Sequence, residues 1–396
     1  FLDKEKKINS DIIEIHNRPN YIKYLKNIQN KKIILYFHND PLSMNGSSSV
    51  KDRIILLNKK TMKNKWNNSE SNKYIRYYKK LKISSDLALR IYTTHLLGRE
   101  KDLVLHGGGN TSLKTSANNI FKEKIDVMHI KGSGWDMGSI DYPGLPAVEL
   151  EPLLKTNNLK KLNDFDMVNL QRKCLLDSKS PNPSVETLLH AFLPHKFVDH
   201  THASAILGLI DQPNDTEICK KVFGDKVGIV PYVIPGFDLA KLSYKIFNNN
   251  KKVIGLILLK HGIFTFGDTA KESYDRMINL VSIAEKELKR FKNKILNKKI
   301  KIQKINTNHY DDLFPIIRKN LSNKNNDGSF TKWIIDFRVN ENILKYLEHP
   351  KLKDFTSRGP VTPDHVIRTK SKPLILNLRN IKKDNLDNLV KNEIKK

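Results

Sequence analysis

The chain has 396 residues, of which 39% are hydrophobic, which is enough for one large domain or two medium ones. No apolar run approaches the roughly 18 residues of a membrane-spanning helix, which excludes a transmembrane protein and leaves no predicted membrane partner. The net charge of +28 comes mostly from dispersed Lys that accompanies abundant Asn and Ile, as an A/T-rich coding sequence produces, and no nucleic-acid-binding motif accompanies it, so no nucleic-acid partner is predicted.

Residues 1–61 differ from the rest of the chain. Two stretches, Ile13–Tyr21 and Tyr36–Gly46, resemble pieces of a glycosyltransferase of the two-Rossmann-domain type. The segment is far too short for a working transferase, so we interpret it as a non-functional remnant or as an artefact of the assembled reading frame. On either interpretation, Met62 is the expected start of the functional protein.

Two helices have clear start signals. A Ser-Ser-Asp cap at Ser84 precedes an apolar-periodic run that Gly98 closes, and Thr269 with Glu272 forms a capping box before a longer helix that ends near Phe291. Short apolar runs between turn residues predict six strands: Leu103–Leu105, Val127–Ile130, Phe197–His202, Val227–Val233, Val253–Leu259 and Ile263–Phe266. This alternation of helices and strands predicts an α/β fold.

The composition divides the chain after the glycosyltransferase-like segment into three parts. Residues 62–291 are the predicted α/β domain, and residues 292–326, rich in Lys, Asn and Ile, are a predicted solvated linker. Residues 327–396 regain apolar character and form a predicted C-terminal extension whose charged tail is expected to fray. Cys174 and Cys219 have no C-x-x-C spacing, which favours neither a disulfide framework nor a thiolate zinc site and fits a cytoplasmic protein.

His200 and His202 flank Thr201 in a predicted strand. Successive side chains of a strand point to opposite faces, so both imidazoles project from the same side. Two imidazoles on one face can occupy adjacent corners around a divalent cation, and a third ligand would still leave a position open for substrate. The alternative is a pair of histidines on a polar sheet face.

His261 offers that third ligand. It follows the strand Val253–Leu259 and precedes Gly262, which places an imidazole at the end of a buried strand where the chain turns sharply. The alternative is a capped core histidine.

Glu186 follows Asn182 and Pro183, the expected cap and first residue of a helix. A carboxylate in the first turn complements the helix dipole. The short connection to the strand of His200 also lets Glu186 face the metal, where a carboxylate can move a proton. His190, one turn later, is expected either to support a ligand or to pack.

Two glycine-rich turns carry backbone amides that can hold an anion. His106–Ser112 adds side-chain donors after its three glycines, and Lys131–Trp135 repeats the device after another strand. Free amides at the helix start near Ser184 complete a predicted phosphate cage. The pattern is not a dinucleotide fingerprint, and the alternative is that both segments are plain turns.

Five motifs in this order resemble the class II aldolase/adducin family: Gly109–Ser112, Lys131–Gly134, Pro183–Glu186, His200–His202 and Lys260–Gly262. Longer stretches are similar to the aldolase half of the bifunctional rhamnulose-1-phosphate aldolase/short-chain dehydrogenase proteins. These stretches are Leu105–Ser112, Lys131–Asp136, Pro181–His202 and Thr362–Lys370.

The resemblance implies a three-layer α/β/α domain with a mainly antiparallel central sheet, a small C-terminal extension, zinc or another divalent cation, and a homo-oligomer. It implies that His200, His202 and His261 are the metal ligands and that Glu186 is the catalytic acid/base. The phosphate-binding positions that it implies are Asn110, Ser112, Ser133, Gly134 and Ser184. The full relatives continue into a dehydrogenase domain, which this sequence lacks, so no NAD-dependent step is expected in this chain.

We therefore predict a metal-dependent aldolase, a carbon–carbon lyase that cleaves a ketose 1-phosphate. The resemblance implies rhamnulose 1-phosphate as substrate, dihydroxyacetone phosphate and an aldehyde such as lactaldehyde as products, and a role in rhamnose catabolism. The metal would polarise the carbonyl while Glu186 manages the proton. The alternatives are a sugar-phosphate epimerase or dehydratase on the same fold, a non-catalytic adducin-like interaction module, and a nucleic-acid binder driven by the positive charge.

Overall fold

The chain divides into two compact units in the computed structural model. The larger comprises residues 46–297 and 361–365, and the smaller comprises residues 1–45, 298–360 and 366–396. The structure describes residues 12–16, 32–36, 61–292, 310–331, 333–335, 343, 346–347, 349–366, 369, 372–376 and 385–395. Most of the predicted glycosyltransferase-like segment lies outside the described residues, which include its parallel strand pair β1 (Ile12–His16) and β2 (Lys32–Tyr36).

A seven-stranded sheet forms the centre of the larger unit, in the order β5-β4-β3-β6-β9-β8-β7. Its strands are β3 (Asn110–Asn118), β4 (Lys124–Ile130), β5 (Ala147–Glu149), β6 (Phe197–Thr201), β7 (Val227–Val230), β8 (Gly255–Leu258) and β9 (Gly262–Gly267). Neighbouring strands are antiparallel except for the parallel pair β7 and β8. The prediction of a mainly antiparallel central sheet is confirmed.

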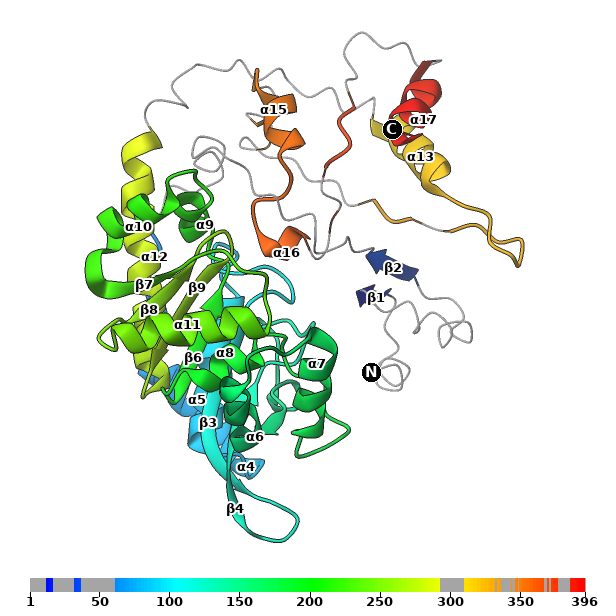
Figure 1. The fold of residues 1–396 in the computed structure, drawn as a ribbon. Coiled ribbons are helices and arrows are strands. Elements are labelled where there is room, and N and C mark those ends of the chain that lie inside the picture. The colour runs from blue at the N-terminus through cyan, green and yellow to red at the C-terminus, as the bar shows by residue number, and fades with distance from the viewer. Residues whose placement is uncertain are drawn as a thin grey trace. The chain divides into compact units, whose positions relative to one another are not determined.

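Helices cover both faces of this sheet (Figure 1). One face is covered by α6 (Leu150–Lys155), α7 (Asp164–Lys173), α8 (Thr187–Phe192) and α11 (Phe237–Asn249). The other is covered by α4 (Asn68–Lys80), α5 (Ser85–Gly98), α9 (Ser204–Ile210), α10 (Asp215–Phe223) and α12 (Ala270–Lys292). Short 3-10 turns are η3 (Tyr142–Gly144), η4 (Thr156–Asn158) and η5 (Gly224–Lys226). The predicted three-layer α/β/α fold is confirmed.

Both predicted helix starts are present. The Ser84 side chain accepts a hydrogen bond from the Leu87 amide and caps α5. Thr269 Oγ1 accepts from the Glu272 amide at 3.1 Å, and Glu272 Oε2 accepts from the Asp268 amide at 2.8 Å. The returning bond of this capping box therefore reaches one residue further back than the motif predicts.

Two local predictions are wrong. Leu103–Leu105 is a turn and coil rather than a strand, because Leu103 and Val104 enter the core directly from the turn that follows α5. The helix expected to begin at Pro183 begins at Thr187, since Pro183 forms a β-bridge with Gly132. Glu186 is consequently the residue before the helix and not a member of its first turn.

The glycine-rich run before Ser112 was also expected to be a loop. Strand β3 begins inside it, at Asn110, because Asn110 to Leu113 pair with β6. The predicted strand Phe197–His202 ends one residue early, at Thr201.

The smaller unit contains helices where a linker and a frayed tail were expected. Helix α13 (Tyr310–Leu321) falls within the predicted linker, and α17 (Leu386–Lys395) falls within the tail. The two pack together through Leu313, Leu386 and Val390, so their amphipathic stripes cover one another. Helices α15 (Leu352–Ser357) and α16 (Pro363–Val366) lie between them in the sequence. No helix in the described residues is long and apolar enough to cross a bilayer.

Candidate metal centre

The three predicted imidazole ligands converge in the larger unit. His200 Nε2 and His202 Nε2 are 3.0 Å apart, and one ring nitrogen from each of His200, His202 and His261 lies within 4.8 Å of the other two. All three side chains are buried, with 0%, 8% and 4% of their surface exposed. Neutral imidazoles at this spacing can share one cation, so the geometry favours metal ligands over histidines on a polar sheet face.

Strand pairing holds the His200 ring in place. His200 is opposite Phe264 of β9, and the two rings stack with their centroids 4.1 Å apart. His200 Nδ1 donates a hydrogen bond to the Ile263 carbonyl at 3.0 Å. Because Nδ1 carries the hydrogen, the lone pair is on Nε2, which faces His202.

His261 is presented by the turn of the β8–β9 hairpin. Leu258 pairs with Gly262, and Lys260 between them has a φ of +59°, a conformation that is unfavourable for a residue with a side chain. Lys260 Nζ is held by Asp215 at 2.9 Å. A Cβ atom at Gly262 would lie 2.4 Å from the Thr201 carbonyl oxygen, so the hairpin can approach β6 closely only with glycine there.

Glu186 lies beside the three imidazoles. Its Oε2 is 3.3 Å from His200 Nε2 and its Oε1 is 3.4 Å from His261 Nε2. Asn110 Nδ2 donates to Oε2 at 2.7 Å, whereas Oε1 is buried and has no hydrogen-bond partner among the residues that the structure describes. A buried carboxylate oxygen without a donor is costly unless a cation or a proton-bearing ligand satisfies it.

The environment sets the charge of each group. Burial lowers the pKa of His261 to about 4 and lowers that of His200 well below its usual value, so both rings are neutral near pH 7. Burial alone would raise the pKa of Glu186, but the neighbouring imidazoles and the Asn110 hydrogen bond outweigh it and lower that pKa to about 2. The neutral rings of His200 and His261 beside an ionised carboxylate suit a metal site, whereas the Asp364 carboxylate outweighs the effect of burial and raises the pKa of His202.

Comparison with known proteins decides the family. The family model of the class II aldolase and adducin N-terminal domain matches residues 89–288, and the model of the second domain of class II aldolases matches residues 308–396. The chain belongs to the class II aldolase and adducin family. The second match begins inside the predicted linker of residues 292–326, at about the position of α13.

Two relatives have substantial identity. The chain is 40% identical to the N-terminal class II aldolase domain of a conserved protein from Thermoplasma acidophilum, with a TM-score of 0.52, covering 57% of this chain and 99% of that one. It is 31% identical over 301 residues to the uncharacterized oxidoreductase YuxG of Bacillus subtilis (strain 168), covering 72% of this chain. The chain spans 41% of the length of that curated relative.

Class II aldolases depend on a divalent metal, and the residues present fit one. Three convergent ring nitrogens supply neutral donors, and the unpartnered Glu186 Oε1 adds negative charge next to them. Nitrogen donors without thiolates suit zinc and several other divalent ions, so the donor set alone does not select one metal.

The predicted phosphate-binding residues fall into two groups. Ser133 and Gly134 are exposed, and Gly134 has a φ of +79° with open space around it. Asn110, Ser112 and Ser184 are buried, with exposed fractions of 4%, 0% and 6%. The structure therefore presents only the turn of Ser133 and Gly134 openly to solvent.

The buried group forms a network around His190. His190 Nε2 donates a hydrogen bond to Asn110 Oδ1, and its Nδ1 accepts one from Ser112 Oγ at 2.8 Å. Asn110 Nδ2 also donates to Ser184 Oγ at 3.0 Å. His190 thus supports Asn110, which in turn holds Glu186, and its ring also packs against Phe264.

Sequence reasoning missed two residues near the centre. Lys131, only 2% exposed, donates from Nζ to the Gly107 carbonyl at 3.0 Å and to the Trp135 carbonyl at 2.7 Å, and so ties the two glycine-rich turns together. Asp364 accepts a hydrogen bond from His202 Nδ1 at 2.6 Å. Both residues stood inside recognised stretches, Lys131–Asp136 and Thr362–Lys370, but the Asp364 contact joins residues 162 positions apart and has no local signal.

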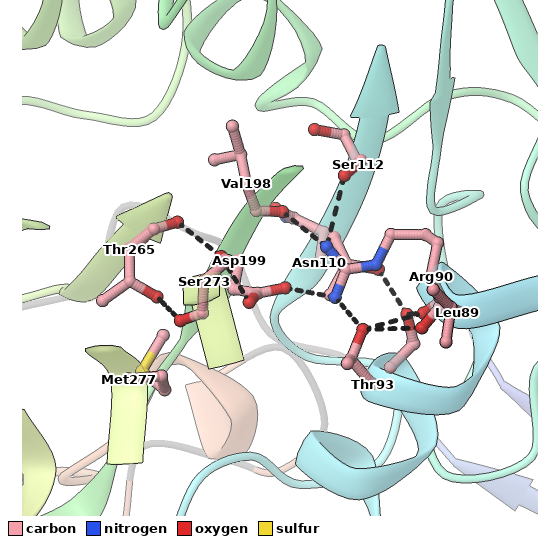
Figure 2. Close-up of polar contacts among 12 residues, drawn as sticks. Leu89, Arg90, Thr93, Asn110, Ser112, Val198, Asp199, Thr265, Ser273 and Met277 are labelled. Atoms are coloured by element: carbon pink, nitrogen blue, oxygen red, sulfur yellow. Dashed lines mark hydrogen bonds and ion pairs between the residues drawn. The ribbon is translucent and has the colours of Figure 1, made fainter. Parts of the chain in front are cut away.

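The opposite face of β6 carries a second polar cluster (Figure 2). Arg90 of α5 pairs with Asp199, and both side chains are completely buried. Arg90 also donates to Thr93 Oγ1 at 2.6 Å, and Ser273 Oγ donates to the other Asp199 oxygen at 2.6 Å. This cluster fixes β6 between α5 and α12 and so holds the strand that carries His200.

Proposed function

We propose that this chain is a metal-dependent lyase that cleaves rhamnulose 1-phosphate into dihydroxyacetone phosphate and lactaldehyde. The observation that carries the proposal is the convergence of three imidazole nitrogens on a buried carboxylate with an unpartnered oxygen. Membership of the class II aldolase family supports an aldolase-type enzyme. The resemblance of the longer stretches to the aldolase half of the bifunctional rhamnulose-1-phosphate aldolase/short-chain dehydrogenase proteins supports this substrate. We extend the proposal to a cytoplasmic homo-oligomer.

His200, His202 and His261 would hold the cation, and three protein ligands leave a position open for the substrate. A bound divalent cation supplies Lewis-acid polarisation of the substrate carbonyl. Zinc is our proposed metal.

Glu186 would move the proton at the carbon that separates from the aldehyde. Its carboxylate is ionised, its Oε1 has no donor among the described residues, and Asn110 fixes its orientation through Oε2. A positioned carboxylate of this kind can accept or return a proton within hydrogen-bond reach.

The five residues from the phosphate-loop positions are proposed as the phosphate site. Ser133 and Gly134 would contact the phosphate directly, because their turn is open and its glycine leaves the backbone accessible. Asn110, Ser112 and Ser184 would shape the wall behind it, since their side chains already bond to His190 and Glu186.

The test is an aldol-cleavage assay on the purified full chain. Dihydroxyacetone phosphate released from rhamnulose 1-phosphate is measured before chelation, after chelation and after addition of Zn²⁺. We expect activity to disappear with the chelator and to return with the metal, while the detection enzymes alone are unaffected. Turnover that persists after complete metal removal would contradict the metal mechanism.

Product analysis on a panel of phosphorylated sugars separates the alternatives. An epimerase would yield an isomeric sugar phosphate without cleavage, and a dehydratase would release water. An adducin-like module would bind without turnover in the metal-loaded state. The complete set of three histidines and one glutamate in the described residues favours an enzyme over such a module.

A further inference from the structure

Asp364 stands in the Thr362–Lys370 stretch but has no role assigned above, and it contacts one of the proposed metal ligands. Its Oδ1 accepts a hydrogen bond from His202 Nδ1 at 2.6 Å, and its side chain is only 1% exposed. It belongs to the segment 361–365, which joins the larger unit although it lies between two stretches of the smaller unit in the sequence, residues 298–360 and 366–396. The metal centre therefore receives a carboxylate from a distant part of the chain.

The glycine-rich turn after α5 holds this carboxylate. Asp364 Oδ2 accepts from the Leu105 amide at 2.7 Å. A Cβ atom at Gly108 would lie 1.6 Å from Asp364 Oδ1, so only glycine at that position leaves room for the carboxylate. The Asp364 amide donates to Thr362 Oγ1 at 3.3 Å, which fixes the segment locally.

We infer that Asp364 is a positioning residue that raises the metal affinity of the centre, and this inference rests on the proposed metal site. A carboxylate that accepts the Nδ1 hydrogen of a ligating histidine fixes the ring orientation, keeps the lone pair on Nε2 and makes that nitrogen a stronger donor. His202 Nε2 faces His200 Nε2 at 3.0 Å in this arrangement. The segment 361–365 thus completes a site whose other residues all lie within residues 89–288.

The three histidines differ in this respect. His200 Nδ1 is held by a backbone carbonyl, and His261 Nδ1 has no partner among the described residues. Among the described residues, His202 is the one histidine of the three whose Nδ1 donates to a carboxylate. Its place just past the end of β6 also gives it less support from strand pairing than His200 has. Asp364 supplies the orientation that the backbone does not.

The measurement is the dissociation constant for Zn²⁺, obtained by competition with a fluorescent chelator, on the full chain. Asp364→Asn keeps the shape and loses the charge, and we expect about tenfold weaker binding; for Asp364→Ala we expect about tenfold to hundredfold. Gly108→Ala places a methyl group where the Asp364 carboxylate lies, so we expect it to weaken Zn²⁺ binding as much as Asp364→Ala does. The control is Asp354→Asn, which removes a half-exposed carboxylate paired with Arg358 at 2.6 Å and should leave affinity unchanged.

The outcomes separate this inference from the proposed function. A wild-type chain without tight Zn²⁺ binding would contradict both. Tight wild-type binding together with Asp364 variants that equal the Asp354→Asn control would contradict the role of Asp364 alone. Thermal melts of the metal-free variants show whether each is folded, because a purely structural role would lower the melting temperature and leave the affinity of the folded protein unchanged.

A measurement on the wild type covers the case in which the variants fail to fold. Nitrogen-15 spectra of the histidine rings in the Zn²⁺-loaded chain, assigned with His202→Gln, report which ring nitrogen carries hydrogen. We expect His202 to keep its hydrogen on Nδ1 and to bind metal through Nε2. A His202 ring with hydrogen on Nε2 would overturn the inference.

Discussion

Glu186 and Asp199 are both buried carboxylates beside β6, but their surroundings differ. Asp199 has an arginine on one oxygen and a serine hydroxyl on the other, as Figure 2 shows. Glu186 has one oxygen held by Asn110 and one oxygen without a donor among the described residues. Folding satisfies both oxygens of Asp199 within the chain, whereas Glu186 keeps one oxygen that no described residue satisfies.

This comparison indicates that the Asp199 charge stabilises the fold, whereas the Glu186 charge belongs to the candidate metal centre. A partnered buried charge is expensive to break and has nothing left to bind with. A carboxylate oxygen with no donor can be neutralised at little cost to folding, but its loss removes a reactive group. The two residues should therefore respond in opposite ways to substitution.

The largest expected effect is on activity at Glu186. Glu186→Gln keeps an oxygen for the Asn110 amide but cannot accept a proton, so we expect kcat for cleavage to fall by about 10² to 10⁴. The melting temperature of the metal-free protein should change little. Glu151→Gln, on an exposed pair with Lys155, is the control and should keep full activity. A Glu186→Gln variant with full kcat would remove its assigned role.

Asp199 should show the opposite response. Asp199→Ala leaves Arg90 buried and unpaired, which is expected to lower the free energy of unfolding by about 3 to 5 kcal/mol in a urea titration of the metal-free protein. Asp86→Ala breaks the half-exposed pair with Lys196 and should cost at most about 1 kcal/mol. Equal losses in the two variants would show that the Asp199 cluster does not hold the sheet.

Binding of Zn²⁺ by the histidines on the Glu186 side of β6 should raise the free energy of unfolding. Zn²⁺ at about 100 times its dissociation constant should add about 2.7 kcal/mol to the free energy of unfolding, because only the folded state gathers the three imidazoles. His200→Ala should abolish the increase, while Asp364→Asn should reduce it. An equal increase in His200→Ala would indicate that the metal binds elsewhere.

The positions of the three histidines in the candidate metal centre could be predicted from local sequence. Period-two alternation puts His200 and His202 on one side, and an apolar strand followed by Gly262 predicts the turn at His261. Each of these signals involves neighbours within a few residues. The Glu186 helix was misplaced because Pro183 pairs with Gly132, which is a contact across 51 positions that a helix-start pattern cannot include.

The remaining features depend on pairing between distant segments. Asn110 to Ser112 were predicted as part of a loop with three glycines, and they form a strand only because they pair with β4 and β6. Arg90 and Asp199 stand in apolar stretches of α5 and β6, where a charge signals an unknown partner but does not identify it. Asp364 contacts both His202 and the Leu105 amide, and no local sequence pattern connects Asp364 to either residue.

The smallest effect tests the second oxygen of Asp199. Ser273→Ala removes the 2.6 Å hydrogen bond to Asp199 Oδ2 from a fully buried serine, and a hydrogen bond to a charged group contributes about 1.5 to 3 kcal/mol, measured by urea unfolding. Ser282→Ala, on the same helix α12 with a 3.4 Å bond to the Met62 carbonyl, is the matched control and should cost less.

The double variant Asp199→Ala with Ser273→Ala sharpens the result. If the serine acts through the carboxylate, the two losses will not add, because Ser273 has already lost its acceptor once Asp199 is removed. Additive losses would instead assign the contribution of the serine hydroxyl to its 3.3 Å hydrogen bond to the Thr265 carbonyl. Asp199 would then have one oxygen that contributes little to folding, and the difference between it and Glu186 would rest on Arg90 alone.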